Sequence, residues 1–520
     1  MIVNPILLQV FRNRFVAIAE EMGVTLGRTA FSPNIKERRD YSCALFDANG
    51  DMIAQAAHIP VHLGSMPLSV KAAIAAIDMQ AGDMVMLNDP FAGGTHLPDI
   101  TLVAPVYVNE SETPAFYVAN RAHHSDVGGM SPGSMPVATS IFQEGLIIPP
   151  TLIVRNGEID RNLFALLLRN VRTPQEREGD FAAQVMANLT GVERSKQLVE
   201  KYGLQQTCDY AGYLNDYAEK MLRQTISAIP DGEYRFEDYL DNDGISTDPV
   251  PLKLKVKITG DAAELDFRES ARQVKGSVNA VYAITLSAVL YCFRCLIKED
   301  VPTNAGIARP LNILTEPGTV VDARFPAAVA GGNVETSQRI VDLVLGALAQ
   351  AIPEQIPAAS QGTMNNTTIG GIDPRTDQPF SYYETLGGGC GATSLHDGAD
   401  AVHSHMTNTL NTPIEALEYA YPFRVTCYGL RSGSGGAGKQ RGGDGLIREI
   451  EMLTDTEVTV LTERRNGSPY GLNGGSNGQN GRNQKISATA ERVPGKITCS
   501  FAAGEKLRIE TPGGGGWGKK

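Results

Sequence analysis

The fold of the first third of the chain depends on two stretches, Gly93-Gly94-Thr95-His96-Leu97-Pro98-Asp99 and Asn120-Arg121-Ala122-His123-His124-Ser125-Asp126-Val127-Gly128-Gly129. Between them lie two runs with the composition of strands, Thr101–Val108 and Ala115–Val118. If these runs pair as one hairpin, the start of the first strand and the end of the second lie side by side, about 5 Å apart across the ladder. This pairing predicts that His96, Asp99 and His123 converge on one point.

Two imidazoles and one carboxylate form a ligand set that suits Mn²⁺, Fe²⁺ or Zn²⁺ and leaves coordination positions open for water or substrate. We therefore assign His96, Asp99 and His123 as candidate metal ligands. His124 and Asp126 are candidates for orienting those ligands by hydrogen bonds. The alternative is a polar loop whose histidines merely cap the ends of the strands.

Outward from these stretches, residues 1–160 are expected to form an α/β region. Asn4-Pro5 is typical of a helix start, and apolar residues follow at helical spacing up to Gly23. Asn49-Gly50 between two short apolar runs indicates a hairpin. A helix from about Pro67 to Met79 is expected to precede the metal-binding hairpin.

Three further regions complete a multi-domain, mixed α/β (α+β) fold. Residues 161–230 carry helical periodicity and form a helical block, and residues 231–360 alternate strand-like runs with two buried helices, an α+β domain. Residues 361–520 hold glycine clusters between strand-like runs. The simplest interpretation of this last third is a glycine-rich, β-rich domain with many tight turns.

Composition excludes several classes of protein. The 520 residues carry a net charge of −12, the wrong sign for a nucleic-acid backbone or an anionic membrane surface. The seven cysteines are odd in number and scattered, which favours reduced thiols. No apolar run reaches the length of a membrane span, and the N-terminus lacks the features of a signal peptide. We expect a cytoplasmic protein that binds neither nucleic acid nor membrane.

The remaining polar clusters give weaker signals. His58 and His62 lack a carboxylate at ligand spacing, so a structural or substrate-facing role is expected; His403 and His405 would share one face of a strand. Asp40 has the default interpretation of a salt-bridged surface residue, and we keep it with His124 and Asp126 as a candidate behind the ligands.

Gly433–Lys439 fits the start of a P-loop pattern. The hydroxyl residue that should follow is replaced by Gln440, and the next residues are a poor helix start. No cofactor-binding residues are therefore assigned here, and ATP, if it is used, is expected to bind another chain.

At these residues the sequence resembles the hydantoinase B / 5-oxoprolinase family, which includes subunits of ATP-dependent hydantoinases and caprolactamase and related subunits of acetone and acetophenone carboxylases. The resemblance runs nearly end to end. Its motifs are Asn34–Asp47, His58–Met66, Asn88-Asp89-Pro90, Gln143-Glu144-Gly145, Gly332–Arg339, Tyr383-Glu384-Thr385, Gly433–Gly445 and Thr511–Gly518.

The resemblance implies a reaction whose two steps are divided between two subunits. A separate hydantoinase A-type subunit uses ATP, with Mg²⁺, to phosphorylate a carbonyl or amide oxygen, and the B subunit completes the conversion at a divalent metal. In the carboxylase relatives the ligands are a His-x-x-Asp and a later His, which match His96, Asp99 and His123 here. The expected assembly is a hetero-oligomer, A2B2 or larger.

Three functions remain open. The first is the B subunit of an ATP-dependent cyclic amidohydrolase that opens a hydantoin, 5-oxoproline or lactam ring. The second is a subunit of an ATP-dependent ketone carboxylase. The third is a non-catalytic structural partner. The ligand set alone also suggests a non-haem iron oxygenase, against which the family resemblance argues.

Overall fold

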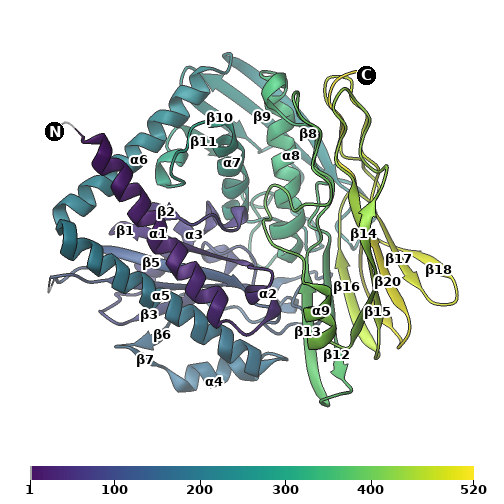
Figure 1. Ribbon diagram of the computed structural model, residues 1–520, viewed down its shortest axis with the longest axis horizontal. Coiled ribbons are helices and arrows are strands. Elements are labelled where there is room, and N and C mark those ends of the chain that lie inside the picture. The colour runs from purple at the N-terminus through teal and green to yellow at the C-terminus, as the bar shows by residue number, and fades with distance from the viewer. Residues whose placement is uncertain (1–2, 110) are drawn as a thin grey trace.

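A computed structural model of the chain describes residues 3–109 and 111–520. It is a mixed α/β structure with several sheets. Figure 1 shows most of the helices and the first sheet on one side, and the strands of the C-terminal third, with helix α9, on the other. Within the part of the chain that is described, no helix combines the length and the apolar character needed to cross a bilayer. All seven cysteines are free thiols.

A seven-stranded sheet organises the N-terminal region, in the order β2-β1-β5-β4-β3-β6-β7 with antiparallel pairs. Its strands are β1 (Tyr41–Asp47), β2 (Met52–Gln55), β3 (Met84–Leu87), β4 (Asp99–Val106), β5 (Phe116–His123), β6 (Thr151–Arg155) and β7 (Glu158–Ile159). The predicted hairpins around Asn49-Gly50 and between the two strand-like runs are both present.

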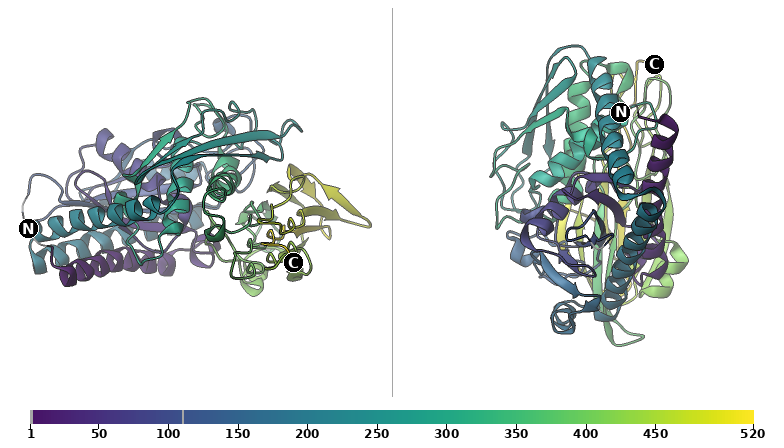
Figure 2. Two further views of the ribbon diagram at one scale, coloured as in Figure 1. Left: turned by 90° about the horizontal axis from the view of Figure 1, so that it is seen from above. Right: turned by 90° about the vertical axis from the view of Figure 1, so that its left-hand side faces the viewer.

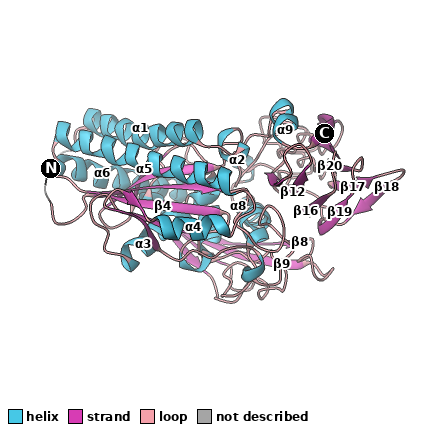
Figure 3. Ribbon diagram, turned by 90° about the horizontal axis from the view of Figure 1, so that it is seen from below, coloured by secondary structure: helices cyan, strands magenta, loops and turns pink. Residues whose placement is uncertain are grey.

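Helices cover both faces of this sheet because its central strands are apolar on both sides. In β1, Cys43 and Leu45 face one core while Ala44 and Phe46 face another. Long helices α1 (Pro5–Thr29) and α5 (Pro174–Tyr202) pack on the first face, and Figure 3 shows them lying together along the strands. Helix α3 (Ser65–Ala76) packs on the opposite face.

The helix start at Asn4 is as the sequence predicts. The Asn4 side chain accepts hydrogen bonds from the backbone N–H groups of Ile6 and Leu7, and Pro5 is the first helical residue. The helix runs on to Thr29, beyond the expected end at Gly23. Gly23 lies inside the helix and does not end it; its missing Cβ makes room for the His58 ring, which a Cβ would approach to 2.6 Å.

The predicted helical block is present and consists of three helices, two of them long. These are α4 (Arg161–Arg169), α5 and α6 (Leu204–Ser227), and a short helix, α2 (Pro33–Lys36), lies at the end of α1. The left view of Figure 2 shows the long helices side by side at the end of the molecule far from the C-terminal third.

The following region is the expected mixture of strands and buried helices. A second sheet has the order β11-β10-β9-β8, formed by β8 (Gly232–Leu240), β9 (Val250–Thr259), β10 (Ala262–Asp266) and β11 (Leu311–Leu314). Helix α8 (Ser337–Leu348) packs on β8 and β9 and against α7 (Tyr282–Leu296). A π-helical turn, Gly332–Thr336, runs directly into α8 and is buried throughout.

Two sheets form the C-terminal third. One has the order β13-β12-β16-β19 and the other β14-β15-β20-β17-β18, and a core of large apolar side chains fills the space between them. The strands are β12 (Asn366–Asp373), β13 (Gln378–Glu384), β14 (Phe423–Arg431), β15 (Gly445–Met452), β16 (Thr456–Leu461), β17 (Arg482–Ile486), β18 (Ala490–Val493), β19 (Lys496–Phe501) and β20 (Lys506–Glu510). Helix α9 (Ile414–Ala420) packs on β14.

Most glycines of this region lie where two backbone segments contact each other, and not in the tight turns that the sequence suggested. Four glycine-rich segments, residues 387–391, 433–443, 471–478 and 513–516, cross one another with direct backbone hydrogen bonds; we call them the glycine bundle. A Cβ on Gly389 would lie 2.0 Å from the Gly443 carbonyl oxygen, and one on Gly514 would lie 1.9 Å from that of Cys390. Only glycine permits backbones to approach so closely.

Candidate metal centre

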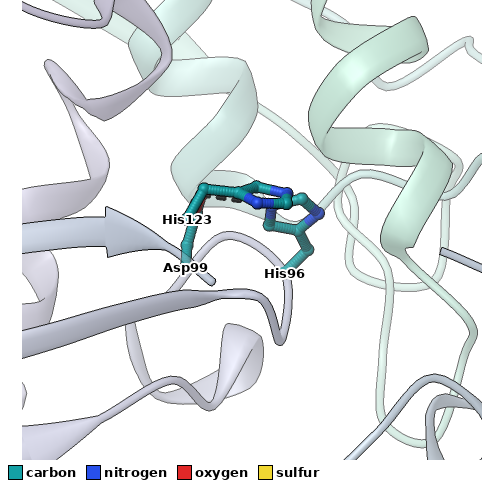
Figure 4. A group of neighbouring side chains, drawn as sticks. All are labelled: His96, Asp99 and His123. Carbon is teal, nitrogen blue, oxygen red and sulfur yellow. Dashed lines mark ion pairs between the residues drawn. The ribbon is translucent and has the colours of Figure 1, made fainter. Parts of the chain in front are cut away.

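The β4–β5 hairpin brings the three predicted ligands together. Asp99 and His123 are register partners at the open end of the hairpin, and His96 lies in the loop that enters β4. One donor atom from each side chain lies within 4.8 Å of the other two. Figure 4 shows the three side chains converging beyond the strand ends, below the pale green helical ribbons. All three are almost fully buried, with 2% exposure at most.

Side-chain hydrogen bonds of Asn88 position the loop before β4. Asn88 Nδ2 donates to the carbonyl oxygens of Leu97 and Leu146, and the N–H of Ile148 donates to Asn88 Oδ1. Gly93 has a φ of 88° and passes so close to α3 that a Cβ would lie 2.6 Å from the Leu68 carbonyl carbon. The glycines therefore let the loop turn tightly against α3, which fixes His96 relative to the strand ends.

Asp99 is the charged member of the cluster. Its Oδ2 accepts a hydrogen bond from Thr95 Oγ1 at 2.6 Å and lies 3.3 Å from Nε2 of both His62 and His96. Burial opposes ionisation, but the charges and hydrogen bonds of His96 and His62 hold the pKa of Asp99 well below its usual range. The cluster therefore contains a carboxylate anion at neutral pH.

Each candidate histidine keeps one buried ring nitrogen without a hydrogen-bond partner, Nδ1 in His96 and Nε2 in His123. The other ring nitrogen of each lies beside an asparagine amide: His96 Nε2 is 3.0 Å from Asn333 Nδ2, and His123 Nδ1 is 3.1 Å from Asn34 Nδ2. An unpartnered buried ring nitrogen costs free energy, and a metal ion removes that cost by binding it. The donor set of two nitrogens and a carboxylate thus fits a divalent metal.

The proton of His123 must move for such binding. Arg38 donates to Asn34 Oδ1, so the Asn34 amide nitrogen faces His123 Nδ1, and a ring that accepts there carries its proton on Nε2. Burial lowers the pKa of His123 well below its usual value, so the ring is neutral. Coordination through Nε2 therefore requires this proton to leave or to shift to Nδ1.

The C-terminal third completes the surroundings of His123. The Tyr383 ring, at the end of β13, stacks on the His123 ring with centroids 4.2 Å apart and planes 10° apart. Arg38 is fully buried and donates to Asn34, to the carbonyl oxygens of Tyr383 and Leu410, and to the hydroxyls of Thr385 and Thr409. The motifs around Asn34 and Tyr383 are far apart in sequence, yet both contact His123.

Asp40 is not the surface residue that its local sequence suggested. It is 7% exposed, its carbonyl oxygen accepts the His123 N–H at 3.0 Å, and Arg38, Asp99 and His96 are close enough to affect its charge. Burial raises the pKa of Asp40 to about 7, against the opposing effect of Arg38. The segment between α2 and β1 is short, so it places this carboxyl inside the fold beside the cluster.

His124 and Asp126 face away from the cluster. His124 Nε2 lies 3.0 Å from Gln184 Oε1 on α5, and its ring packs on Phe181. Asp126 accepts hydrogen bonds from the backbone and the guanidinium of Arg172. Since neighbouring residues of a strand point to opposite sides, His123 and His124 diverge where β5 ends.

Sequence reasoning missed two residues at this site. His62 reaches Asp99 from the loop before α3, and Asn333 reaches His96 from the π-helical turn. His62 lacked a carboxylate at ligand spacing because its partner, Asp99, lies 37 residues later at the start of β4. The motifs His58–Met66 and Gly332–Arg339, both quoted for the family resemblance, were the available signal.

The other histidine pair and the glycine-lysine segment lie elsewhere. His403 and His405 stand outside any strand, and His405 has a φ of 58°. Gly433–Lys439 belongs to the glycine bundle, where a Cβ on Gly436 would lie 2.1 Å from the Ser476 carbonyl oxygen. The next element after it is strand β15, whereas a phosphate-binding loop leads into a helix.

The family model for hydantoinase B/oxoprolinase matches residues 4–520. The chain is 40% identical to 5-oxoprolinase 1 of Arabidopsis thaliana over 99% of its own length, yet it spans only 42% of that relative. It is 31% identical to the putative D-/L-hydantoinase B subunit of a Pseudomonas species, covering 99% of this chain and 90% of the relative.

The ATP-dependent caprolactamase from Pseudomonas jessenii has a similar structure, with a TM-score of 0.92 and 30% sequence identity over 100% of this chain and 92% of the other. This likeness covers the N-terminal sheet, the helical block and the C-terminal third together. With a family model across nearly every residue and relatives of 30–40% identity, the chain belongs to the hydantoinase B/oxoprolinase family.

Proposed function

We propose that this chain is the B subunit of an ATP-dependent cyclic amidohydrolase, which opens the ring of a hydantoin, 5-oxoproline or a lactam at a divalent metal held by His96, Asp99 and His123. The observation that carries the proposal is the buried carboxylate with two histidines, each of which has one ring nitrogen without a partner. The relatives named as a 5-oxoprolinase, a hydantoinase and a caprolactamase support the substrate class.

In this proposal the metal, Mn²⁺, Zn²⁺ or Fe²⁺, would supply Lewis-acid activation of the water that attacks the phosphorylated amide. His96 and His123 present neutral nitrogen ligands, and Asp99 offsets part of the positive charge. Thr95 and His62 hold the Asp99 carboxylate in place through hydrogen bonds to Oδ2. Burial of the cluster excludes bulk water, which strengthens each of these interactions.

The ATP-dependent step belongs, in this proposal, to a hydantoinase A-type partner that binds ATP and Mg²⁺. Resonance makes an amide bond resistant to water, and phosphorylation of its oxygen removes that resonance and provides a leaving group. The Pseudomonas hydantoinase relative is named as one subunit of its enzyme, and the matched 5-oxoprolinase carries further sequence beyond the part that this chain resembles. We propose a hetero-oligomer, A2B2 or larger.

Two further assignments belong to the proposal. The chain divides into an α/β region at 1–160, a helical block at 161–230, an α+β domain at 231–360 and a glycine-rich, β-rich domain at 361–520. The cellular site is the cytoplasm, for which seven free thiols are the supporting observation.

The test is ATP-dependent turnover by the chain together with its A-type partner, against hydantoin, 5-oxoproline and caprolactam. We expect ring opening that requires ATP, partner and metal, with the Asp99→Asn variant as the matched control. The Asp99→Asn complex should still consume some ATP while ring opening stops. Turnover of ketones that requires bicarbonate would instead assign a carboxylase, and full ring opening without this chain would assign a structural role.

A further inference from the structure

One π-helical turn lies behind the candidate metal centre. The turn, Gly332–Thr336, closes with a hydrogen bond from the Ser337 N–H to the Gly332 carbonyl oxygen, five residues apart, and it is buried throughout. Turns of this kind are rare and are often found at functional sites. Two polar side chains leave the turn, those of Asn333 and Glu335, and their contacts show what it holds.

Backbone contacts fix the position of the turn. Just before it, the Glu144 carboxyl accepts two consecutive backbone N–H groups. The Gly332 N–H donates to the Ser277 carbonyl oxygen at 3.0 Å, and a Cβ on Gly332 would lie 1.8 Å from the carbonyl oxygen of Asn279. Only glycine permits such an approach, so the start of the turn is held against the segment that precedes α7.

Asn333 and Glu335 contact different parts of the molecule, because residues two positions apart on a helical turn do not face each other. Asn333 Nδ2 lies 3.0 Å from His96 Nε2. Glu335 Oε1 accepts hydrogen bonds from the Met364 N–H at 3.0 Å and from Asn366 Nδ2 at 2.6 Å. The turn therefore reaches one candidate ligand directly and the start of β12 on its other side.

A chain of three side chains connects Glu335 to the second candidate histidine. Asn366, the first residue of β12, donates to Glu335 through Nδ2, while its Oδ1 accepts the hydroxyl of Tyr383 at 2.9 Å. The Tyr383 ring is the one that stacks on His123, 4.2 Å away. Each member of this chain is at most 2% exposed, so bulk water does not compete for its hydrogen bonds.

Each hydrogen bond in the chain orients the next group. Glu335 Oε1 already accepts the Met364 N–H, so it presents an acceptor to Asn366, and the amide must turn Nδ2 toward it. The amide oxygen then faces Tyr383 and fixes the hydroxyl end of that ring. Since the ring lies flat on His123, with planes 10° apart, a fixed tyrosine restrains the tilt of the imidazole.

We propose that the π-helical turn positions both candidate metal-binding histidines, with Asn333 acting on His96 and Glu335 acting on His123 through the two side chains between them. Glu335 is a positioning residue, since its hydrogen bonds go to neither histidine. One turn thus sets the relative placement of two ligands that come from different segments, which prepares them to bind a metal together. This inference rests on the proposed metal site, because it names what holds two of its ligands.

Three substitutions interrupt or restore the chain. Tyr383→Phe removes only the hydroxyl and keeps the stacked ring. Glu335→Met removes the acceptor at similar side-chain length, and Glu335→Gln restores an acceptor oxygen. Thr367→Val is the matched control, because Thr367 follows Asn366 on β12 and its Oγ1 is also buried but has no hydrogen-bond partner.

The first measurement is NMR of the metal-free, full-length chain labelled with ¹³C at histidine Cε1, which gives one signal for each of eight histidines. His96→Gln and His123→Gln assign the two signals of interest. The ring current of a stacked tyrosine depends on its placement, so Glu335→Met and Tyr383→Phe should both shift the His123 signal more than the His96 signal. Asn333→Ala should do the reverse, a crosswise pattern that general loosening of the fold would not produce.

The second measurement is the Zn²⁺ affinity of the same variants, by competition with a chelating dye. Glu335→Met and Tyr383→Phe should each weaken binding about 3- to 10-fold, the effect of one ordinary hydrogen bond. The double variant should be no weaker than the weaker of the two single variants, because both changes interrupt one chain. Glu335→Gln should recover most of the loss, and Thr367→Val should match the wild type in both measurements.

An unshifted His123 signal in Tyr383→Phe, or losses of affinity that add fully in the double variant, would overturn the inference. The conservative Tyr383→Phe variant decides the matter even if Glu335→Met does not fold. A wild-type chain that binds no Zn²⁺, but whose His123 signal responds to these changes, would reject the proposed metal site and still support the positioning role. ATP-dependent turnover with the partner tests the proposed function separately.

Discussion

His62 Nε2 lies 3.3 Å from Asp99 Oδ2, while Nδ1 of the same ring lies 2.8 Å from Ser42 Oγ. When the Ser42 hydroxyl donates to Nδ1, the ring carries its proton on Nε2 and donates it to the carboxylate. His62 thereby restrains the rotation of Asp99 through Oδ2, the oxygen that also lies 3.3 Å from His96 Nε2. Such hydrogen bonds to a ligating group tune metal affinity.

Replacing His62 with Phe should lower the metal affinity of the purified chain by about 10- to 100-fold. His62→Gln, whose amide can still donate to Asp99, should recover part of that loss. His58→Phe is the control, because His58 Nδ1 accepts from the Cys43 N–H and makes no hydrogen bond to Asp99. Competitive titration with a chelating dye measures all three, and equal affinities across them would contradict this role of His62.

Asp99→Asn should nearly abolish metal binding without unfolding the chain. The substitution keeps the shape of the side chain and removes the only carboxylate of the three candidate ligands. His96→Ala and His123→Ala should each reduce metal content sharply as well. Elemental analysis after dialysis, paired with circular dichroism, separates loss of metal from loss of fold; full metal content in all three variants would reject the site.

Glu144 should make the wild-type protein less stable as the pH rises. Its Oε1 accepts the backbone N–H groups of Val329 and Ala330, and burial raises its pKa from 4.5 to about 8. Between these values the folded state holds a proton that the unfolded state has lost, so stability falls with rising pH by up to about 3 kcal/mol between pH 5 and pH 8.

The Glu144→Gln variant isolates this effect, because glutamine keeps the acceptor and cannot ionise. It should match the wild type near pH 5 and exceed it at pH 8 in urea unfolding. Glu158→Gln, on the exposed strand β7, should follow the wild type at every pH. Parallel curves for Glu144→Gln and the wild type would show that Glu144 ionises normally.

The β4–β5 hairpin could be predicted from sequence because its signals are local. Strand-like runs, a glycine-rich entry and the period of two place Asp99 opposite His123 without any knowledge of the rest of the fold. The same reasoning placed Asp40 on the surface, because charge in a polar segment is usually solvated. Asp40 is buried because the segment between α2 and β1 packs against the end of β5 and against Tyr383. Tyr383 lies hundreds of residues later in the sequence, so no local pattern encodes this contact.

The glycines of the last third illustrate the same limit. A glycine cluster in sequence indicates a backbone that needs either a positive φ or close approach, and the sequence does not distinguish the two. The structure does so, since a Cβ on Gly389, Gly436 or Gly514 would lie 2.0, 2.1 or 1.9 Å from a backbone oxygen of another segment. These contacts join segments far apart in the sequence. The sequence therefore shows where the glycines cluster, but tight turns were the wrong explanation for most of them.

Gly514→Ala should therefore destabilise the chain by more than about 4 kcal/mol or prevent folding of the C-terminal third. Its Cβ would lie 1.9 Å from the Cys390 carbonyl oxygen, which rigid backbone cannot accommodate. Gly212→Ala is the control: apart from its chain neighbours and the backbone of its own helix, no described atom lies within 4 Å of its Cβ, and alanine in helix α6 should stabilise by roughly 0.5–1 kcal/mol. Soluble yield and thermal unfolding report both, and comparable stability of the two variants would refute close contact at Gly514.

The hydrogen bond from Arg38 to the Leu410 carbonyl oxygen joins residues separated by 372 positions. At a synthesis rate of about 5–20 residues per second, the ribosome reaches Leu410 roughly 20–70 s after it has made Arg38. During that interval the Arg38 guanidinium lacks several of its acceptors, and for most of it His123 lacks Tyr383, the residue that stacks on it. The nascent chain thus carries the candidate ligands long before the segments that enclose them have been made, so the cluster reaches its buried geometry only once the C-terminal third has been synthesised.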